Sequence, residues 1–343
     1  MANFNQLIKK LDKGNILGSI RDLPEQCQQA WTEVKKIKLP TAYKKIENII
    51  VCGMGGSNIG TDFLRNVFYR EIRYPVLIVN DYQLPGYVSS KSLVIVSSYS
   101  GNTEESLSCL KEALKRKSKI IVITAGGKLA KVAQNKKILA YIFAPIHNPS
   151  NQPRMGLGYS IMAQLGLLKK LNLVKVQEVE IKKAIVDLSK TKVEEKAKIL
   201  AQKIYQKMPI VVGAEFLSGN VHILANQINE NAKTFAEYFL LPELNHHLME
   251  GLKFPSKKNL IFLFLESKNY SKVIKKRIAI TKRVLNKAKV TFLSYNTSSK
   301  GKLSEGLEAL SAGSYISFYL SLLNNIDPSE IPTVDYFKKE LTL

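Results

Sequence analysis

Short apolar runs recur along the chain, and each one ends in a polar or glycine-rich break. Runs of this length without an alternating polar face are typical of strands buried on both sides, as in a parallel sheet covered by helices. In the first half of the chain they lie at 46–52, 74–81, 92–97, 119–124 and 139–146. After the third run, 105–117 places Leu107, Leu110 and Leu114 on one helical face. The first half therefore predicts parallel strands that alternate with helices.

The same pattern restarts in the second half, after a lysine- and glutamate-rich helical stretch at about 176–207. Strands are expected at 208–216, 234–239, 259–267 and 289–296. The helix expected at 306–325 is rich in apolar and small residues, which predicts that it is buried. The fold class is therefore α/β, with two similar doubly wound domains, each a mainly parallel sheet flanked by helices. We expect an N-terminal helical segment at 1–45, a first domain at 46–175, and a connector, second domain and tail at 176–343.

Composition narrows the class of protein. The chain has 343 residues, of which 45% are hydrophobic, enough for a sizeable core. Three cysteines, Cys27, Cys52 and Cys109, lie far apart and without metal-ligand spacing, which predicts a reducing cytoplasm and no metal site. The start resembles no signal peptide, and no apolar run reaches the ~18 residues of a membrane span. We therefore expect no membrane partner.

The charge is strongly positive, with 51 Lys and Arg against 28 Asp and Glu, a formal net charge of +23. Such a balance can indicate a nucleic-acid surface. The lysines, however, stand singly or in short pairs along predicted helices, without the interleaved aromatic residues that bind single strands. This pattern favours solvated helix faces over a specific nucleic-acid site. The positive field also attracts anionic metabolites.

Two loops at predicted strand ends carry candidate chemistry, because ligands of open parallel sheets bind beyond the carboxyl ends of the strands. The first loop, CGMGGSNIG at 52–60, brings Ser57 to a helix start behind three glycines. This loop also contains part of the dinucleotide-binding pattern GxGxxG, with Asp81 where a ribose-binding acid would lie. Asn58 replaces the third glycine, so the match is weak.

The second loop, SSYSGNTEE at 97–105, gathers hydroxyl side chains and a glycine before a predicted helix. A helix N-terminus with unpaired N–H groups and a positive dipole end suits a phosphate. The alternative interpretation needs no ligand, because Asn102 and Glu105 fit a capping box. Two such loops on neighbouring strands favour the phosphate.

Together these loops resemble the sugar isomerase (SIS) domain superfamily, whose serine and threonine loops hold a sugar phosphate. Three further segments are similar to one branch of it, the bifunctional phosphoglucose/phosphomannose isomerases: NQINENAK at 226–233, PELNHH at 242–247 and IDPSEIPTVDYFKKEL at 326–341. The resemblance runs from about residue 45 to the end. It implies two SIS-type domains and a homodimer. It also implies interconversion of glucose 6-phosphate or mannose 6-phosphate with fructose 6-phosphate through a cis-enediol.

The resemblance also implies roles for single residues. The positions that match the phosphate-binding loops are Gly56, Ser57, Ser98, Ser100 and Thr103. The catalytic positions are Arg154, which stabilises the enediolate, Glu230 as the base, His246 for ring opening, and Lys338. The register of Lys338 against Lys339 stays open. The second histidine, His247, departs from the family pattern, which has asparagine there.

The chemistry suits these residue types. A carboxylate can move one proton between C1 and C2 without a metal or a redox cofactor, and partial burial raises its pKa toward the operating pH. We expect the amides of Asn229 and Asn231 to orient Glu230. An imidazole titrates near neutrality and can move a proton between O5 and O1 of the closed ring. Without the resemblance, Glu237 and Glu243 would be equal rivals to Glu230. The alternative function is a non-catalytic sugar-phosphate regulator.

Overall fold

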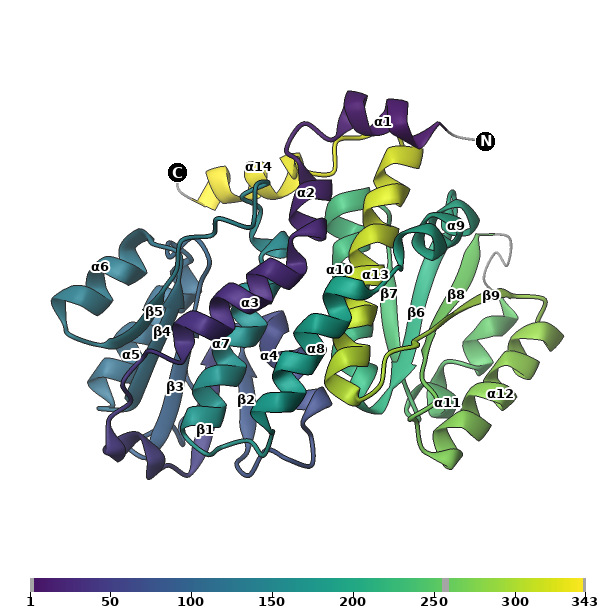
Figure 1. Ribbon diagram of the computed structural model, residues 1–343. Helices are drawn as coiled ribbons and strands as arrows, with labels where there is room; N and C mark the ends of the chain where they lie inside the picture. Colours follow the sequence, from purple (N-terminus) through teal and green to yellow (C-terminus); the bar gives the residue numbers. More distant parts are fainter. Residues whose placement is uncertain (1–2, 255–258, 342–343) are drawn as a thin grey trace. The chain divides into compact units, whose positions relative to one another are not determined.

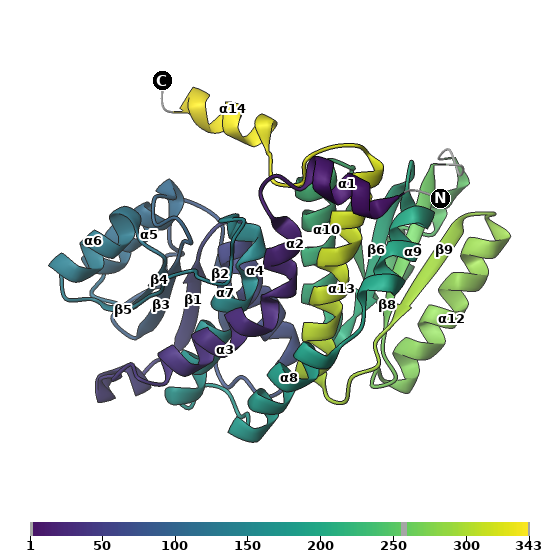
Figure 2. The same ribbon diagram turned by 45° about the horizontal axis from the view of Figure 1, so that its top comes forward.

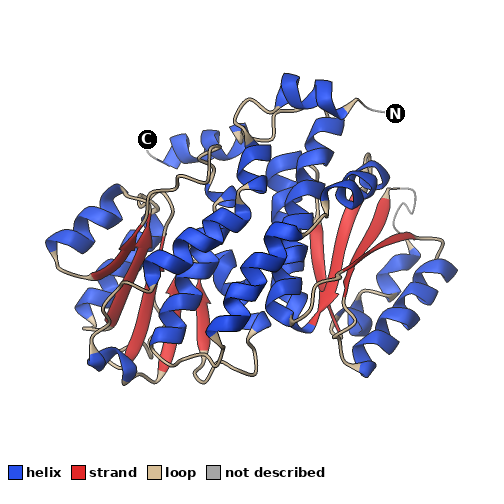
Figure 3. Cartoon of the chain, viewed as in Figure 1, coloured by secondary structure: helices blue, strands red, loops and turns tan. Residues whose placement is uncertain are grey.

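The computed structural model describes residues 3–254 and 259–341 and is of the α/β class (Figures 1 and 3). Its contacts divide the chain into two compact units. We call residues 21–189 the first-sheet unit, and residues 1–20 with 190–343 the second-sheet unit. Each unit contains one parallel sheet with its own helices, and each is described by itself below.

The first-sheet unit contains a five-stranded parallel sheet in the order β2-β1-β3-β4-β5. Its strands are rich in valine and isoleucine, and β3 is buried throughout. Their bounds are β1 Asn48–Cys52, β2 Val76–Val79, β3 Ser92–Ser97, β4 Lys119–Thr124 and β5 Leu139–Ile142. Because β1 lies between β2 and β3, the chain leaves β1 in opposite directions, and the loops after β1 and β3 flank the topological switch point.

Six helices belong to the described residues of this unit. They are α3 Leu23–Val34, α4 Gly56–Val67, α5 Glu104–Lys115, α6 Gly127–Asn135, α7 Leu157–Lys170 and α8 Glu178–Lys190, with 3-10 turns η1 Thr41–Lys44 and η2 Pro153–Met155. The predicted apolar face of α5 is confirmed, since Leu110 is buried in the core with Val94 and Val96 of β3, and Leu107 and Leu114 pack against it. This packing against β3 holds the N-terminus of α5 at the loop that follows β3.

The second-sheet unit contains a four-stranded parallel sheet in the order β7-β6-β8-β9. Its strands are β6 Met208–Ala214, β7 Glu237–Leu241, β8 Leu260–Glu266 and β9 Thr291–Asn296. Its helices are α1 Phe4–Leu11, α2 Ile16–Arg21, α9 Glu194–Ile204, α10 Ser218–Ala232, α11 Leu244–His247, α12 Lys272–Lys287, α13 Lys302–Leu323 and α14 Pro332–Leu341, with 3-10 turns η3 Glu215–Leu217 and η4 Glu250–Lys253. The switch point lies between β6 and β8.

Helices α10 and α13 pack together on one face of this sheet, and α12 covers the other face (Figures 1 and 2). The prediction that the long C-terminal helix is buried is confirmed, since every residue of α13 from Leu303 to Leu322 is buried. The expected strand at 234–239 is displaced, because β7 begins only at Glu237. Ala236 instead bonds the side chain of Asn229 at the end of α10. Among the described residues, no helix has the length and apolarity that crossing a bilayer requires.

Candidate active site

The two candidate loops meet at the switch point of the first sheet. Ser57 lies in the first turn of α4 and is 8% exposed. Its Oγ accepts a hydrogen bond of 3.1 Å from the backbone N–H of Tyr99, in the loop after β3. The hydroxyl predicted on one loop is therefore fixed by the other, as expected for loops at the ends of adjacent parallel strands.

In the loop after β3, two hydroxyl groups face each other and a third bonds the backbone of the loop itself. The Oγ of Ser98 lies 2.8 Å from the Oγ1 of Thr103 and accepts from the N–H of Gly101 at 3.1 Å. The Oγ of Ser100 accepts from the N–H of Asn102 at 3.3 Å. Gly101 has a φ of +70°, and a Cβ there would lie 1.8 Å from the carbonyl oxygen of Gly126, so only glycine fits. The loop is thus a fixed cluster of hydroxyl groups.

The capping-box interpretation of this loop is wrong. The N-cap of α5 is Thr103, and no described side chain accepts a hydrogen bond from the first turn of that helix. Asn102, the expected cap, accepts instead from the N–H of Lys128 at 3.0 Å. Glu104 and Glu105 balance the helix dipole by charge but leave the N–H groups without a side-chain acceptor. The N-terminus of α5 therefore offers donors to an anion.

Arg154 lies next to the first loop. It belongs to the turn η2, is 5% exposed, and donates from Nη1 to Oε1 of Gln152 at 2.8 Å. A Cβ on Gly56 would lie 3.0 Å from the carbonyl oxygen of Pro153 and 3.3 Å from Cα of Arg154, so a glycine at 56 permits this approach. The structure thus brings Gly56, Ser57 and Arg154 together at the start of α4.

Tyr99 is a further residue of this site, and the sequence pattern did not predict it. It lines a small cavity with Gly56, Ser57 and Pro153. Its ring meets Phe143 edge to face at 5.7 Å, and its hydroxyl oxygen accepts from Nδ2 of Asn148 at 2.7 Å. Burial raises the pKa of Tyr99, so the phenol stays neutral at physiological pH. Its place in the sequence between Ser98 and Ser100 is the signal from which it could have been predicted as a site residue.

In the second sheet, the chain's own carboxylates accept hydrogen bonds from the described loop after β8. In the loop after β8, Ser267 donates from Oγ to Oε2 of the buried Glu305 at 2.5 Å. The N–H of Ser271 donates to Oε2 of Glu215 at 3.1 Å, and its Oγ caps α12 by accepting from the N–H of Ile274 at 3.3 Å. These donors of the loop after β8 are therefore already used by the chain itself.

Glu230 lies in the last turn of α10 and is half-buried. The expectation that Asn229 orients it is wrong. Nδ2 of Asn229 donates to the carbonyl oxygens of Ala225 at 2.9 Å and Ala236 at 2.8 Å, and its Oδ1 accepts from the N–H of Ala236 at 3.2 Å. Nδ2 of Asn231 donates to Oγ of Ser317 at 3.0 Å. These amides fix the end of α10 against β7 and α13.

His246 lies in the four-residue helix α11 and is exposed. Its helix and that of Glu230 lie on opposite faces of the second sheet. His222 of α10 stacks on Tyr238 with ring centroids 4.7 Å apart, whereas His247 of α11 lies 6.1 Å from Phe239. Tyr238 and Phe239 are consecutive residues of β7, so their side chains point to opposite faces. Within one chain the structure does not bring Glu230 and His246 together.

Lys338 lies on α14, none of whose described residues is buried. Lys339 follows it on the same exposed helix, so exposure does not distinguish the two lysines.

Among residues 3–254 and 259–341, no group of three His, Cys, Asp or Glu side chains is placed to hold a metal ion.

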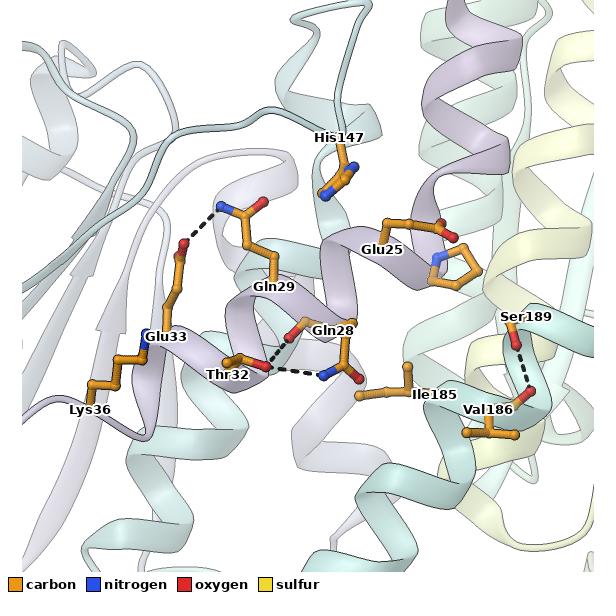
Figure 4. A pocket seen from close by; sticks show the side chains of 11 residues that line it. Glu25, Gln28, Gln29, Thr32, Glu33, Lys36, His147, Ile185, Val186 and Ser189 are labelled. Atoms are coloured by element: carbon orange, nitrogen blue, oxygen red, sulfur yellow. Dashed lines mark hydrogen bonds between the residues drawn. The ribbon is translucent and has the colours of Figure 1, made fainter.

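A larger cavity, of about 540 Å³, lies elsewhere in the first-sheet unit and contains none of the predicted site residues. It is a groove between α3 and α8 (Figure 4). Two pairs of its polar side chains bond each other, from Gln28 to Thr32 and from Gln29 to Glu33, each at 3.0 Å. This groove is therefore separate from the hydroxyl loop and shares no residue with it.

Comparisons with known proteins agree with the two-sheet architecture. Residues 42–171 match the model of the SIS domain, and residues 193–341 match that of the bacterial phospho-glucose isomerase C-terminal SIS domain. A bifunctional phosphoglucose/phosphomannose isomerase of Caldicellulosiruptor bescii is 35% identical over 94% of this chain and 98% of its own length. Another bifunctional phosphoglucose/phosphomannose isomerase, from Aquifex aeolicus, is 32% identical over 92% of this chain and 95% of its own length. The solved tagatose-6-phosphate ketose/aldose isomerase of Escherichia coli shares the fold, with a TM-score of 0.71 and 14% identity over 91% of this chain and 93% of that one.

Proposed function

Because the chain belongs to the family of bifunctional phosphoglucose/phosphomannose isomerases, we propose that it interconverts glucose 6-phosphate and mannose 6-phosphate with fructose 6-phosphate. The observation that carries this proposal is the hydroxyl loop at the first switch point, where Ser98 and Thr103 lie 2.8 Å apart before an uncapped helix. The test is a coupled assay of the purified protein with both aldose phosphates. Turnover of neither one would refute the proposal.

The phosphate is held in the first-sheet unit. Ser57, Ser98, Ser100 and Thr103 supply hydroxyl groups, and Gly56 and the start of α5 supply backbone N–H groups. A dianionic phosphate takes several such donors at once, and hydrogen bonds to a charged group are about twice as strong as neutral ones. The phosphate therefore anchors the sugar while its first carbons react.

Replacing Thr103 with alanine is expected to raise KM roughly 10- to 100-fold with kcat nearly unchanged, because one hydrogen bond to a charged group is lost from ground state and transition state alike. The measurement is steady-state kinetics with fructose 6-phosphate. Ser108→Ala, one turn further along α5, is the matched control and should leave KM unaltered. A fall in kcat at constant KM would argue against a binding role.

Proton transfer between C1 and C2 is the work of Glu230, and Arg154 supplies fixed positive charge where the enediolate forms. Removing the C2 proton of either aldose epimer gives the same planar enediol. One base therefore serves glucose 6-phosphate and mannose 6-phosphate, provided that the pocket accepts rotation about C2–C3. Lys338 adds a further cation to this catalytic set.

His246 opens the sugar ring by moving a proton between O5 and the anomeric hydroxyl, which is O1 in the aldose phosphates and O2 in fructose 6-phosphate. We expect His246→Ala to lower kcat/KM for fructose 6-phosphate about 100-fold, because general acid–base catalysis of ring opening is lost. The analogue 5-deoxyfructose 6-phosphate lacks O5, never forms the ring, and should be slowed little. Following C1 proton exchange of both compounds by NMR makes the comparison. Equal slowing of the two would remove the ring-opening role.

We further propose a homodimer in which His246 of the partner subunit completes each site. The separation of α10 and α11 by the second sheet supports this arrangement, because Glu230 and His246 must act on neighbouring atoms of one sugar. In a two-fold symmetric dimer both sites are completed in the same way. A reducing cytoplasmic setting is also proposed, since Cys27, Cys52 and Cys109 are buried thiols.

A further inference from the structure

The helix that carries His246 is too short to hold its own shape. Helix α11 has four residues, Leu244–His247, and isolated helices shorter than about 12 residues are unstable in water. Leu244 is its one buried side chain, whereas His246 and His247 are exposed. The position of His246 therefore depends on the contacts that fix this segment to the rest of the second-sheet unit.

A closed circuit of hydrogen bonds joins this segment to α12. Nδ2 of Asn245 donates to Oγ1 of Thr281 at 2.8 Å, and that hydroxyl donates in turn to the carbonyl oxygen of Arg277 at 2.8 Å. Nη1 of Arg277 donates back to Oδ1 of Asn245 at 3.1 Å. The donor and acceptor roles are fixed, because the Thr281 hydroxyl already donates its only proton to the backbone carbonyl of Arg277 and can only accept from Asn245.

The circuit is built on a rigid support. Thr281 is 2% exposed, in a row of buried α12 side chains that also contains Ile278 and Leu285. Adjacent residues of a helix point about 100° apart, so a segment that turns Asn245 toward α12 turns His246 away from it. The contact thus determines the direction in which the imidazole is presented.

We infer that Asn245, held by Thr281 and Arg277, is a positioning residue for ring opening by His246. This inference rests on the proposed isomerase function. Acid–base catalysis by His246 requires its nitrogen within hydrogen-bonding reach of the sugar oxygens. A displacement of about 1 Å can cost a hundredfold in rate. Loss of the circuit therefore acts on the ring-opening step and leaves proton transfer at C1 and C2 intact.

The test compares fructose 6-phosphate, which forms a ring, with 5-deoxyfructose 6-phosphate, which does not. Asn245→Ala is expected to lower kcat for fructose 6-phosphate roughly 10- to 100-fold and to leave the open-chain analogue within about twofold. Asn286→Ala, an exposed asparagine of α12, is the matched control and should alter neither rate. A merely structural role for Asn245 would slow both compounds alike and would overturn the inference.

A second pair of variants keeps the test informative if Asn245→Ala fails to fold. Thr281→Val keeps the shape but removes the hydroxyl and should reproduce the selective loss, whereas Thr281→Ser keeps the hydroxyl and should restore the rate. In a His246→Ala background, Asn245→Ala should cause no further loss. If His246→Ala itself slows both compounds equally, the proposed role of His246 fails. If His246→Ala discriminates between them and Asn245→Ala and Thr281→Val do not, the positioning inference alone fails.

Discussion

Glu230→Gln is expected to lower kcat about a thousandfold in both directions, because the amide cannot accept the proton that moves between C1 and C2. The substitution keeps the size of the side chain and the end of α10, which Asn229 and Asn231 fix independently. Fructose 6-phosphate should still bind with nearly unchanged affinity, because the hydroxyl loop is untouched. Steady-state kinetics and titration calorimetry measure the two quantities.

Two other carboxylates of the same unit serve as matched controls. Glu237 at the start of β7 and Glu243 before α11 are both exposed. Changing either one to glutamine should leave kcat within a few-fold of the native protein. A larger loss in one of these variants than in Glu230→Gln would assign the base to another residue.

The second prediction concerns which subunit of the proposed dimer supplies Glu230 and which supplies His246 at each site. Glu230→Gln and His246→Ala chains, co-expressed with different tags and purified as a heterodimer, should recover about half of the native activity per dimer, since one of two symmetric sites then combines both native residues. Each variant homodimer should have little activity with fructose 6-phosphate. The assay is turnover of this closed-ring substrate by the purified heterodimer.

The reciprocal heterodimer distinguishes a site shared between subunits from a site within one chain. A native chain paired with a chain that carries both substitutions should be nearly inactive, because each site then lacks one of the two residues. If a single chain supplied both groups, this heterodimer would retain half of the activity, and the first heterodimer would recover none. The two arrangements therefore give opposite outcomes in both experiments.

Much of the fold could be predicted from the sequence because its strands are buried on both faces. Continuous runs such as Leu93–Val96 are difficult to accommodate elsewhere, and all nine expected strands are present in the described chain. The start of β7 was misplaced because Ala236 takes its hydrogen-bond partners from the side chain of Asn229, at the end of the preceding helix. The pattern of apolar residues, from which the strand was predicted, contains no signal for this side-chain contact.

The site was predictable to a similar degree. Hydroxyl groups at a strand end indicated the loop, and the structure brings Ser98 close to Thr103 as the turn requires. The capping box failed because Asn102 bonds the backbone of Lys128, 26 residues away in the sequence. The placement of α10 and α11 on opposite faces follows from the crossover direction and not from any motif. The domain bounds, the phosphate ligands and the roles of Glu230, His246, Arg154 and Lys338 stay predictions.

In the proposed mechanism, one carboxylate moves a proton between the first two carbons of a phosphate-anchored hexose. The direct test is to incubate the protein with fructose 6-phosphate in D2O and to follow the products by NMR. We predict that glucose 6-phosphate and mannose 6-phosphate both form with deuterium at C2, and that neither forms with Glu230→Gln at a comparable rate. Binding of the sugar phosphate without either aldose would indicate a regulator instead. Aldoses that stay free of deuterium over many turnovers would contradict transfer through an enediol.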